Sequence, residues 1–241
     1  MGLLTGRRAL VTGGHGGLGS IAVRTLLDLD AEDVLVVGRS RDKLEAFRAA
    51  HGVRVSVDAL DVTDPAAWRT IDGRPVDVLI PCAGAAYRAP FVATDYEVWR
   101  ALVDTNLMGT LLAVRSVLPG MLERGWGRIV LISSAAATIG LPGRAVYGAS
   151  KAALEAFARA LAPEIGSRDV LVNCLAPGMF PTEMTQDWLR ANPDVAEGIR
   201  TAIPLGRFGE TEELASAFRF ALEATYAQGS VIHIDGGWGV V

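Results

Sequence analysis

The sequence predicts an α/β protein, a Rossmann-like, doubly wound parallel sheet of about seven strands with helices on both faces. Short runs of β-branched and aliphatic residues alternate with helical patterns along the whole chain. The first run leads directly into a glycine-rich turn that opens a helix, an arrangement typical of phosphate-binding α/β units. Later runs end in small or polar residues, at the edge where such sheets bind their ligands.

Length and composition limit the class of protein. The 241 residues suit a single domain over 1–241, and half of them are hydrophobic. The net charge of −4 without a basic run argues against a nucleic-acid partner. No apolar stretch approaches the roughly 20 residues of a membrane span, and the N-terminus lacks the apolar segment of a signal peptide, so we predict a cytoplasmic protein without a membrane partner.

The two cysteines and three histidines carry little chemistry in this pattern. Cys82 and Cys174 are expected to be reduced, buried and inert, as is usual for a cytoplasmic chain. Together with the scattered histidines they form no metal-ligand spacing, and we predict no metal site.

A glycine-rich turn follows the first predicted strand, 8–12. Gly13, Gly17 and Gly19 lie in this turn, and a helical pattern runs from 20 to about 29. Glycines let the backbone approach a phosphate closely, and the helix N-terminus adds N–H donors and a partial positive charge. The turn therefore predicts a phosphate site, with a ligand-free glycine turn as the alternative.

The second predicted strand, 33–38, is followed by Arg39 and a helix from 41 to about 50. A carboxylate at the end of this strand would bind the ribose hydroxyls of NAD, and none is present. The Arg39 guanidinium instead suits the 2′-phosphate of NADP, which it can bind in a forked geometry. The alternative is a solvated loop charge.

The third predicted strand, 53–57, precedes Asp61 and Val62. Asp61 is suited to accept a hydrogen bond from the adenine amino group, with Val62 against the ring. The alternative is that Asp61 caps a short helix near 64–68, where Thr63 and Asp64 are also common capping residues.

A long helix is predicted at 96–123 and contains Asn106. Asparagine is mildly unfavourable inside a helix and often has a specific role there, with capping or core hydrogen bonding as the alternative. The remaining strands are predicted at 76–80, 128–132, 170–175 and 230–234, and the turn Pro81-Cys82-Ala83-Gly84 follows the first of them.

The stretch from Ser134 to Lys151 follows the fifth strand, and its helix is predicted to run to about 162. Tyr147 and Lys151 are one helical turn apart on the same face, so an ammonium lies beside a phenol. A free phenol has a pKa of about 10, and a neighbouring cation favours the phenolate, which makes Tyr147 a candidate acid–base group. Ser134 can hydrogen-bond the oxygen whose charge changes. Alone, the tyrosine–lysine spacing is more often an ordinary pair on a helix surface.

Taken together, the motifs resemble those of the classical short-chain dehydrogenases/reductases, in particular members similar to bacterial 3-oxoacyl-carrier-protein reductases. The resemblance covers essentially the whole chain. Its matching pieces are Thr12-Gly13-x-x-x-Gly17-x-Gly19, Asp61-Val62, Ala83-Gly84, Asn106, Ser134, Tyr147-x-x-x-Lys151, Asn173, Pro177-Gly178, Thr182 and Asp235-Gly236-Gly237. The chain departs from the family at Pro81-Cys82, where two asparagines are usual, and this is expected to alter local hydrogen bonding more than chemistry.

The resemblance implies a role for each matching residue. Tyr147 would be the acid–base catalyst, Lys151 would lower its pKa and hold the nicotinamide ribose, and Ser134 would polarise the carbonyl. Asn106 would position a water in a proton relay with Lys151. The implied cofactor site comprises Thr12, Gly13, His15, Gly17, Leu18, Gly19, Arg39, Ser40, Asp61, Val62, Ala83, Gly84, Tyr147, Lys151, Pro177, Gly178, Phe180 and Thr182. Family members that prefer NADP carry arginine at the position of Arg39, although the basic residue that many have at Gly16 is absent here.

The resemblance also implies a reaction and an assembly. The expected activity is NADPH-dependent reduction of a ketone or other carbonyl to a secondary alcohol by hydride transfer, or the reverse. The alternatives are an NAD-dependent alcohol dehydrogenase and a non-catalytic module that senses dinucleotides. A homotetramer or homodimer would form through the helices that carry Asn106 and Tyr147, where small residues permit close approach: Ala152, Ala153, Ala156, Ala158 and Ala160.

The segment 183–203 is expected to form a mobile lid over the substrate. Apolar residues of this lid and of the facing loops indicate an apolar or mixed pocket, or else plain packing: Met184, Trp188, Leu189, Ile199, Ile139, Leu141 and Met179. Arg144 or Arg88 could meet an anionic substrate, although isolated arginines mostly face solvent. The candidate substrates are 3-oxoacyl thioesters, polyketide ketones, sugars and steroid-like ketones.

Overall fold

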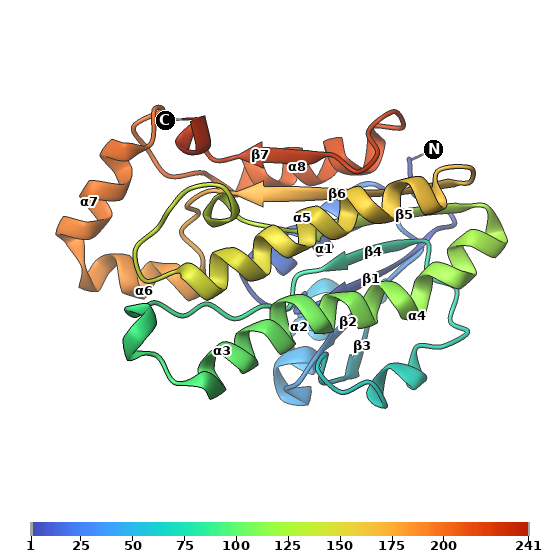
Figure 1. Cartoon of the computed structure of the whole chain (residues 1–241). Coiled ribbons are helices and arrows are strands. Elements are labelled where there is room, and N and C mark those ends of the chain that lie inside the picture. The colour runs from blue at the N-terminus through green and yellow to red at the C-terminus, as the bar shows by residue number, and fades with distance from the viewer. Residues whose placement is uncertain (1, 241) are drawn as a thin grey trace.

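The structure is a computed structural model that describes residues 2–240, apart from the side chains of residues 183 and 184. Its centre is a seven-stranded sheet in the order β3-β2-β1-β4-β5-β6-β7, and every pairing is parallel (Figure 1), which confirms the predicted fold class. The strands are β1 (Arg8–Thr12), β2 (Asp33–Gly38), β3 (Val55–Ala59), β4 (Val78–Pro81), β5 (Trp126–Ile132), β6 (Asp169–Pro177) and β7 (Val231–Ile234).

Helices cover both faces of the sheet. The apolar sides of α1, α2 and α8 pack on one face, and those of α4 and α5 pack on the other, where Figure 1 shows them in front of the strands. The α-helices are α1 (Gly17–Asp28), α2 (Arg41–His51), α3 (Tyr96–Val103), α4 (Gly109–Arg124), α5 (Ala145–Ile165), α6 (Glu183–Ala191), α7 (Pro193–Ala202) and α8 (Thr211–Glu223). Short 3₁₀ turns lie at Ala67–Thr70, Phe91–Ala93, Ala135–Ala137 and Trp238–Val240.

Several element boundaries differ from the sequence-based prediction. Strand β3 begins at Val55 rather than residue 53, because Gly52 has a positive φ of 82° and Val53 lies fully exposed in the turn. Helix α1 begins at Gly17, three residues early, since the end of the glycine turn is already helical. Strand β6 continues to Pro177, so it carries its terminal residues further toward the ligand-binding edge.

Helix α8 was not predicted from the sequence, although the sequence carries two signals for it. Glu210 and Glu213 form a reciprocal capping box, in which the Glu213 carboxylate accepts from the Glu210 backbone N–H at 2.8 Å. Its buried residues follow the helical period that turns one apolar face to the sheet: Leu214, Ala217, Phe218, Ala221 and Leu222.

The order in which the chain adds strands to the sheet reverses between β1 and β4: β2 and β3 lie on one side of β1, and β4 to β7 lie on the other. Because β1 pairs with both β2 and β4, the loops that leave β1 and β4 diverge and open a crevice at their carboxyl ends. The two loops are also tied together there: the Thr12 hydroxyl accepts from the Ala83 backbone N–H at 3.0 Å, and the Thr12 carbonyl accepts from Cys82 N–H at 3.0 Å. This edge carries most of the predicted site residues.

One helical segment is long and apolar enough to cross a membrane, whereas the sequence predicts no such segment. It is Tyr96–Arg124, with 29 residues and a mean hydropathy of 1.3. Core helices of water-soluble proteins also meet these criteria. Here the segment buries Val114, Val117 and Met121 in the apolar layer between α4 and the sheet. The cytoplasmic location stays a prediction.

Candidate active site

The glycine-rich turn between β1 and α1 is shaped for close contact with a ligand. Gly13 has φ +64°, and a Cβ there would lie 2.9 Å from Ala83 Cα. A Cβ at Gly19 would overlap the Gly13 carbonyl oxygen, so only glycine lets helix and turn pack this closely. None of the described side chains caps α1, and its first turn carries no acidic residue, which leaves the N–H groups of Gly17, Leu18 and Gly19 facing the end of the helix as anion donors.

Arg39 and its neighbours lie at the end of β2. Arg39 is exposed, and Ser40 acts as the N-cap of α2 with its hydroxyl 3.5 Å from Lys43 N. The His15 ring packs closely over Gly38, where an added Cβ would lie only 2.8 Å from His15 Cε1. The turn after β1 and the start of α2 therefore bring an imidazole and a guanidinium to one corner of the crevice.

Asp61 caps the turn that follows β3. Its Oδ1 accepts from the Thr63 backbone N–H at 2.9 Å and from the Thr63 hydroxyl at 2.8 Å. These two hydrogen bonds, and to a smaller extent the charge of Arg39, lower the pKa of Asp61. Asp61 therefore holds the local turn through Thr63 and does not cap the short helix as the alternative supposed: the 3₁₀ turn lies at Ala67–Thr70, and its N-cap, Ala66, has no side-chain hydrogen bond. The contacts of Asp61 and Val62 with an adenine stay predictions.

Tyr147 and Lys151 face each other from successive turns of α5. Lys151 is buried, its Nζ lies 5.9 Å from the centroid of the Tyr147 ring, and the ammonium donates to the Ile132 carbonyl at 2.9 Å. Among the described side chains, no carboxylate forms an ion pair with Lys151. An ammonium held by a backbone carbonyl, without a neutralising acid, directs its charge at the phenol.

Ser134 lies at the start of the loop that joins β5 to α5. Its hydroxyl accepts from Ala136 N–H at 3.2 Å and caps the 3₁₀ turn Ala135–Ala137. This turn rests against the beginning of α5, since a Cβ at Gly148 would lie 2.5 Å from the Ala136 carbonyl oxygen. Ser134 is therefore held next to the turn of α5 that carries Tyr147.

Asn106 lies in a π-turn, Asp104–Met108, between α3 and α4, and it is fully buried. Its Oδ1 accepts from Ala85 N–H at 2.8 Å, and its Nδ2 donates to the Ala85 carbonyl at 2.9 Å. The carboxamide thereby pairs with both backbone groups of the loop after β4, the core hydrogen-bonding alternative. Asn106 Oδ1 and Lys151 Nζ also approach one point, lying 3.3 and 3.8 Å from a Cβ placed on Gly84. The water-relay role of Asn106 stays a prediction.

The end of β6 lies beside the glycine-rich turn. Gly178 N–H donates to Ile234 O at 2.9 Å, and Phe180 is buried against Gly209. Thr182 begins α6 with a capping box, and its Cβ lies 3.3 Å from the position of a Cβ on Gly17. The predicted residues of this strand end thus reach the same crevice as the glycine turn.

The apolar residues predicted to line the substrate pocket are partly engaged in packing. Ile139, Leu141, Met179 and Ile199 contact a small cluster formed by Ala135, Ile203 and Trp238. Leu189 is buried in α6, whereas the side chain of Met184 lies outside the described residues. The packing alternative therefore accounts for several of them.

The cysteines are free thiols with little reactivity. Burial raises the pKa of Cys174 to about 12, and burial likewise raises that of Cys82 to about 12, although Cys82 as a residue is partly exposed. Among residues 2–240 with described side chains, no group of three or more His, Cys, Asp and Glu residues is placed to hold a metal ion.

Three supporting residues are not among the predicted site residues. Ser133 donates to the buried Glu155 carboxylate at 2.7 Å, which ties the end of β5 to α5 one turn beyond Lys151. Ser150 donates to the Tyr147 carbonyl at 2.7 Å and accepts from Asn106 Nδ2 at 3.3 Å. An acidic residue on the sheet-facing side of α5 was the available signal for Glu155, since buried carboxylates require partners.

The chain matches the short chain dehydrogenase family over residues 7–193. A 3-oxoacyl-[acyl-carrier-protein] reductase of Aquifex aeolicus is 33% identical, with 97% of this chain and 98% of the relative covered. A gluconate 5-dehydrogenase of Gluconobacter oxydans is 34% identical, with 97% and 95% covered. Among solved structures, an actinorhodin polyketide ketoreductase variant determined with NADPH has a TM-score of 0.89 at 28% identity and covers 98% of each chain.

Proposed function

The chain belongs to the short-chain dehydrogenase family of oxidoreductases, and we propose that it uses NADPH to reduce a ketone or other carbonyl to a secondary alcohol, or catalyses the reverse oxidation. The observation that carries this proposal is the buried Lys151 ammonium beside the Tyr147 ring, with Asn106 behind it and Ser134 held at the neighbouring loop. A phenol next to an uncompensated cation suits a reaction in which one proton moves to or from an oxygen.

The proposed cofactor fits the crevice. The glycines of the Gly13–Gly19 turn let its backbone pack closely against Ala83 and the start of α1, and the N–H donors at the start of α1 suit a pyrophosphate. Arg39 would pair with the 2′-phosphate, with His15 and Ser40 beside it. Leu18, Asp61, Val62, Ala83, Gly84, Pro177, Gly178, Phe180 and Thr182 complete the proposed site.

The residues around Tyr147 divide the work of the proposed reaction. A bound nicotinamide nucleotide would supply the hydride to the carbonyl carbon. Tyr147 would donate its phenolic proton to the oxygen as it becomes an alkoxide, and Ser134 would hydrogen-bond the same oxygen. Lys151 would stabilise the resulting phenolate, and the proton would be restored through the buried polar groups around Asn106. Oxidation of the alcohol would follow the same steps in reverse.

Substitution of Arg39 tests the proposed cofactor preference. Arg39→Ala is expected to weaken NADPH binding by about 10- to 100-fold, the value of a lost charge-assisted hydrogen-bonded pair, and to leave NADH binding nearly unchanged. Calorimetric titration of both nucleotides into both proteins measures the difference. Arg41→Ala, which removes an exposed arginine two residues away on α2, is the matched control and should retain the preference of the unmodified protein.

Two outcomes would contradict the proposal in different ways. Equal or tighter binding of NADH by the unmodified protein would favour the alternative NAD-dependent alcohol dehydrogenase. Binding of neither nucleotide would contradict a dinucleotide site altogether. A sensing module without catalysis would bind NADPH but transfer no hydride to any ketone.

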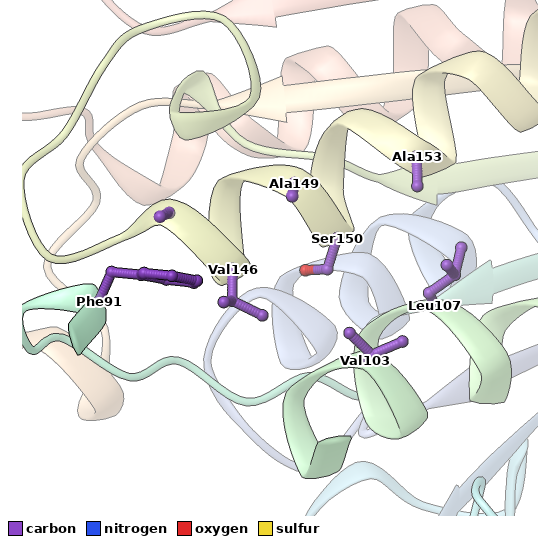
Figure 2. Close-up of a pocket in the computed structure, with 8 residues that line it drawn as sticks. Phe91, Val103, Leu107, Val146, Ala149, Ser150 and Ala153 are labelled. Atoms are coloured by element: carbon purple, nitrogen blue, oxygen red, sulfur yellow. The ribbon is translucent and has the colours of Figure 1, made fainter. Parts of the chain in front are cut away.

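We also propose that the chain forms a homodimer or homotetramer through α5 and the helical segment that carries Asn106. An apolar groove of about 320 Å³ lies between α5 and the part of this segment formed by α3 and the π-turn, and Figure 2 shows Val103 and Leu107 on one side facing Val146 and Ser150 on the other. Large apolar side chains nearby are exposed to solvent: Phe91, Val92, Tyr96 and Met108. A second copy of this surface would cover them, since monomeric proteins rarely expose large contiguous apolar patches. Of the predicted alanines, Ala158 points into the core instead.

A charge placed in this groove should prevent assembly. Ala149 is exposed at the groove, and Ala149→Glu is expected to convert the oligomer to a monomer because an unpaired carboxylate would be buried at the contact. Light scattering during size-exclusion chromatography measures the mass. Ala50→Glu on α2 is the control and should leave the oligomer intact; a monomeric unmodified protein would contradict the assembly.

The segment 183–203 is proposed as the substrate lid. It begins beside Thr182, which contacts the glycine turn, and continues through α6 and α7, where Trp188 meets Arg88. Its start beside the glycine turn and the contact of Trp188 with Arg88 support a role in covering the substrate.

A further inference from the structure

Two guanidinium groups lie near the start of α5, and one of them lies over the Tyr147 ring. Arg144 is at the N-terminus of α5, and its Cζ lies 5.4 Å from the centroid of the Tyr147 ring. Arg88 comes from the loop after β4, and its Cζ lies 5.2 Å from the centroid of Trp188 in α6. A Cβ on Gly143 would be 3.1 Å from Arg88 Cγ, so the Arg88 side chain crosses the residue that precedes Arg144.

Neither arginine is neutralised by a carboxylate of the described side chains. Elsewhere the arginines of the described chain pair repeatedly with carboxylates, as Arg124 does with Asp77 and Arg207 with Glu213. Among the side chains that the structure describes, the guanidinium groups of Arg88 and Arg144 form no ion pair and donate no hydrogen bond, and each instead lies over an aromatic ring. An acidic chain thus places one unpaired guanidinium over the ring of its candidate acid–base group and a second one near the first.

The environment makes this arrangement unfavourable without a partner. Partial burial of Arg144 lowers the pKa of its guanidinium, Tyr147 opposes this shift, and the positive charge of Arg88 adds to it. Arg144 is half-buried and Arg88 is exposed, and two like charges near each other are stabilised when an anion binds between them. Arginine suits carboxylate and phosphate groups in particular, since its planar fork donates two parallel hydrogen bonds.

The position of the pair separates it from the proposed nucleotide phosphates. Those phosphates would lie at the N-terminus of α1 and near Arg39, at the ends of β1 and β2. Arg88 comes from the loop after β4 and Arg144 from the start of α5, and their neighbours Tyr87 and Gly143 line one small hollow with Tyr147. The anion that they would meet therefore belongs to the second reactant.

We propose that Arg144 and Arg88 bind an anionic group of the carbonyl substrate, so that preferred substrates carry a carboxylate or phosphate a few bonds from the reacting carbonyl. The inference rests on the proposed reductase function and narrows its substrate class. The pair would hold one end of the substrate while Ser134 and Tyr147 hold the carbonyl oxygen, which also fixes the face of the carbonyl presented for reduction.

Matched ketones test the inference on the intact protein with NADPH. The first pair is 4-oxopentanoate and its methyl ester, the second is dihydroxyacetone phosphate and dihydroxyacetone, and the third is acetoacetyl-CoA and the uncharged acetoacetyl-pantetheine. We expect kcat/KM to be at least about tenfold higher for the anionic member of the first pair, the second pair or both, the value of one charge-assisted contact. The third pair places the anion far from the carbonyl.

Substitutions then assign the preference to the two arginines. Arg144→Gln and Arg88→Gln are each expected to lower the anionic-to-neutral ratio of kcat/KM by about 10- to 100-fold, mostly through KM, whereas Arg144→Lys should retain part of it. Arg24→Gln, an exposed arginine on α1, is the control and should leave the ratio unchanged. Calorimetric binding of NADPH to each variant verifies that it is folded.

Each outcome has a distinct meaning. A preference within the first pair identifies a carboxylate and one within the second a phosphate, and either supports the inference if the arginine variants reduce it. Equal rates within both of these pairs, a preference limited to acetoacetyl-CoA, or a ratio that neither variant changes would overturn the inference and leave the reductase function intact. Failure to reduce any ketone with NADPH or NADH would instead contradict the proposed function.

Discussion

Tyr147→Phe is expected to lower kcat by about 10²- to 10⁴-fold, the contribution usual for a general acid–base group, while NADPH still binds. The phenylalanine keeps the ring that Lys151 and Arg144 approach at 5.9 and 5.4 Å and removes only the hydroxyl. Without that proton, hydride transfer would leave an uncompensated alkoxide. Single-turnover oxidation of NADPH at saturating ketone, followed by its absorbance, measures the chemical step.

A matched control separates the missing hydroxyl from a general effect of the substitution. Tyr226 is fully exposed in the loop after α8, and Tyr226→Phe should retain the rate of the unmodified protein. A Tyr147→Phe variant with an unchanged rate would show that another group transfers the proton. The sensing-module alternative would gain support if the unmodified protein bound NADPH and transferred no hydride.

Asn106→Ala is expected to destabilise the protein and to lower its activity together. The substitution leaves the N–H and C=O of Ala85 unpaired in a part-buried position, at about 1–3 kcal/mol for each unsatisfied group. The loop that carries Ala83 and Gly84 would then lose its link to the helix, and Lys151 would lose a neighbour at the site. Urea unfolding measures the free energy, and steady-state kinetics with NADPH measures kcat.

Asn106→Asp distinguishes the two hydrogen bonds of this link. An aspartate keeps an acceptor for Ala85 N–H but turns a second oxygen toward the Ala85 carbonyl, so it should remain destabilising. Asn192→Ala removes a single side-chain hydrogen bond, to the Trp188 carbonyl at 2.8 Å, and should have a smaller effect on stability and none on NADPH affinity. Unchanged stability of Asn106→Ala would contradict the structural role assigned to this carboxamide.

The parts of the fold and site that follow from the sequence are those set by local periodicity. The seven strands could be placed because buried parallel strands are continuous apolar runs, and Tyr147 and Lys151 could be paired because four residues bring two side chains to one helical face. The boundaries of β3 and α1 were less accurate, since they depend on turn conformations that no apolar pattern records.

Contacts between distant segments were outside the reach of the sequence. The pairing of Asn106 with Ala85, of Lys151 with the Ile132 carbonyl and of Ser133 with Glu155 depends on how the helices lie over the sheet. Each joins residues about 20 positions apart in the chain, so neither a helical nor a strand period relates them. For the same reason the sequence indicates Arg88 and Arg144 only as separate arginines and does not show that they lie near each other.

The π-turn at Asp104–Met108 sets the rotational phase of a helix that has two neighbours. Each residue of an α-helix advances about 100° around the axis, and a π-turn holds one residue more in its hydrogen-bonded ring. The side chains before and after it are therefore out of phase by about one residue. As a result α3 faces α5, whereas α4 faces β4 and β5. One extra residue thus lets a continuous helical segment line the groove through α3 and pack in the protein interior through α4.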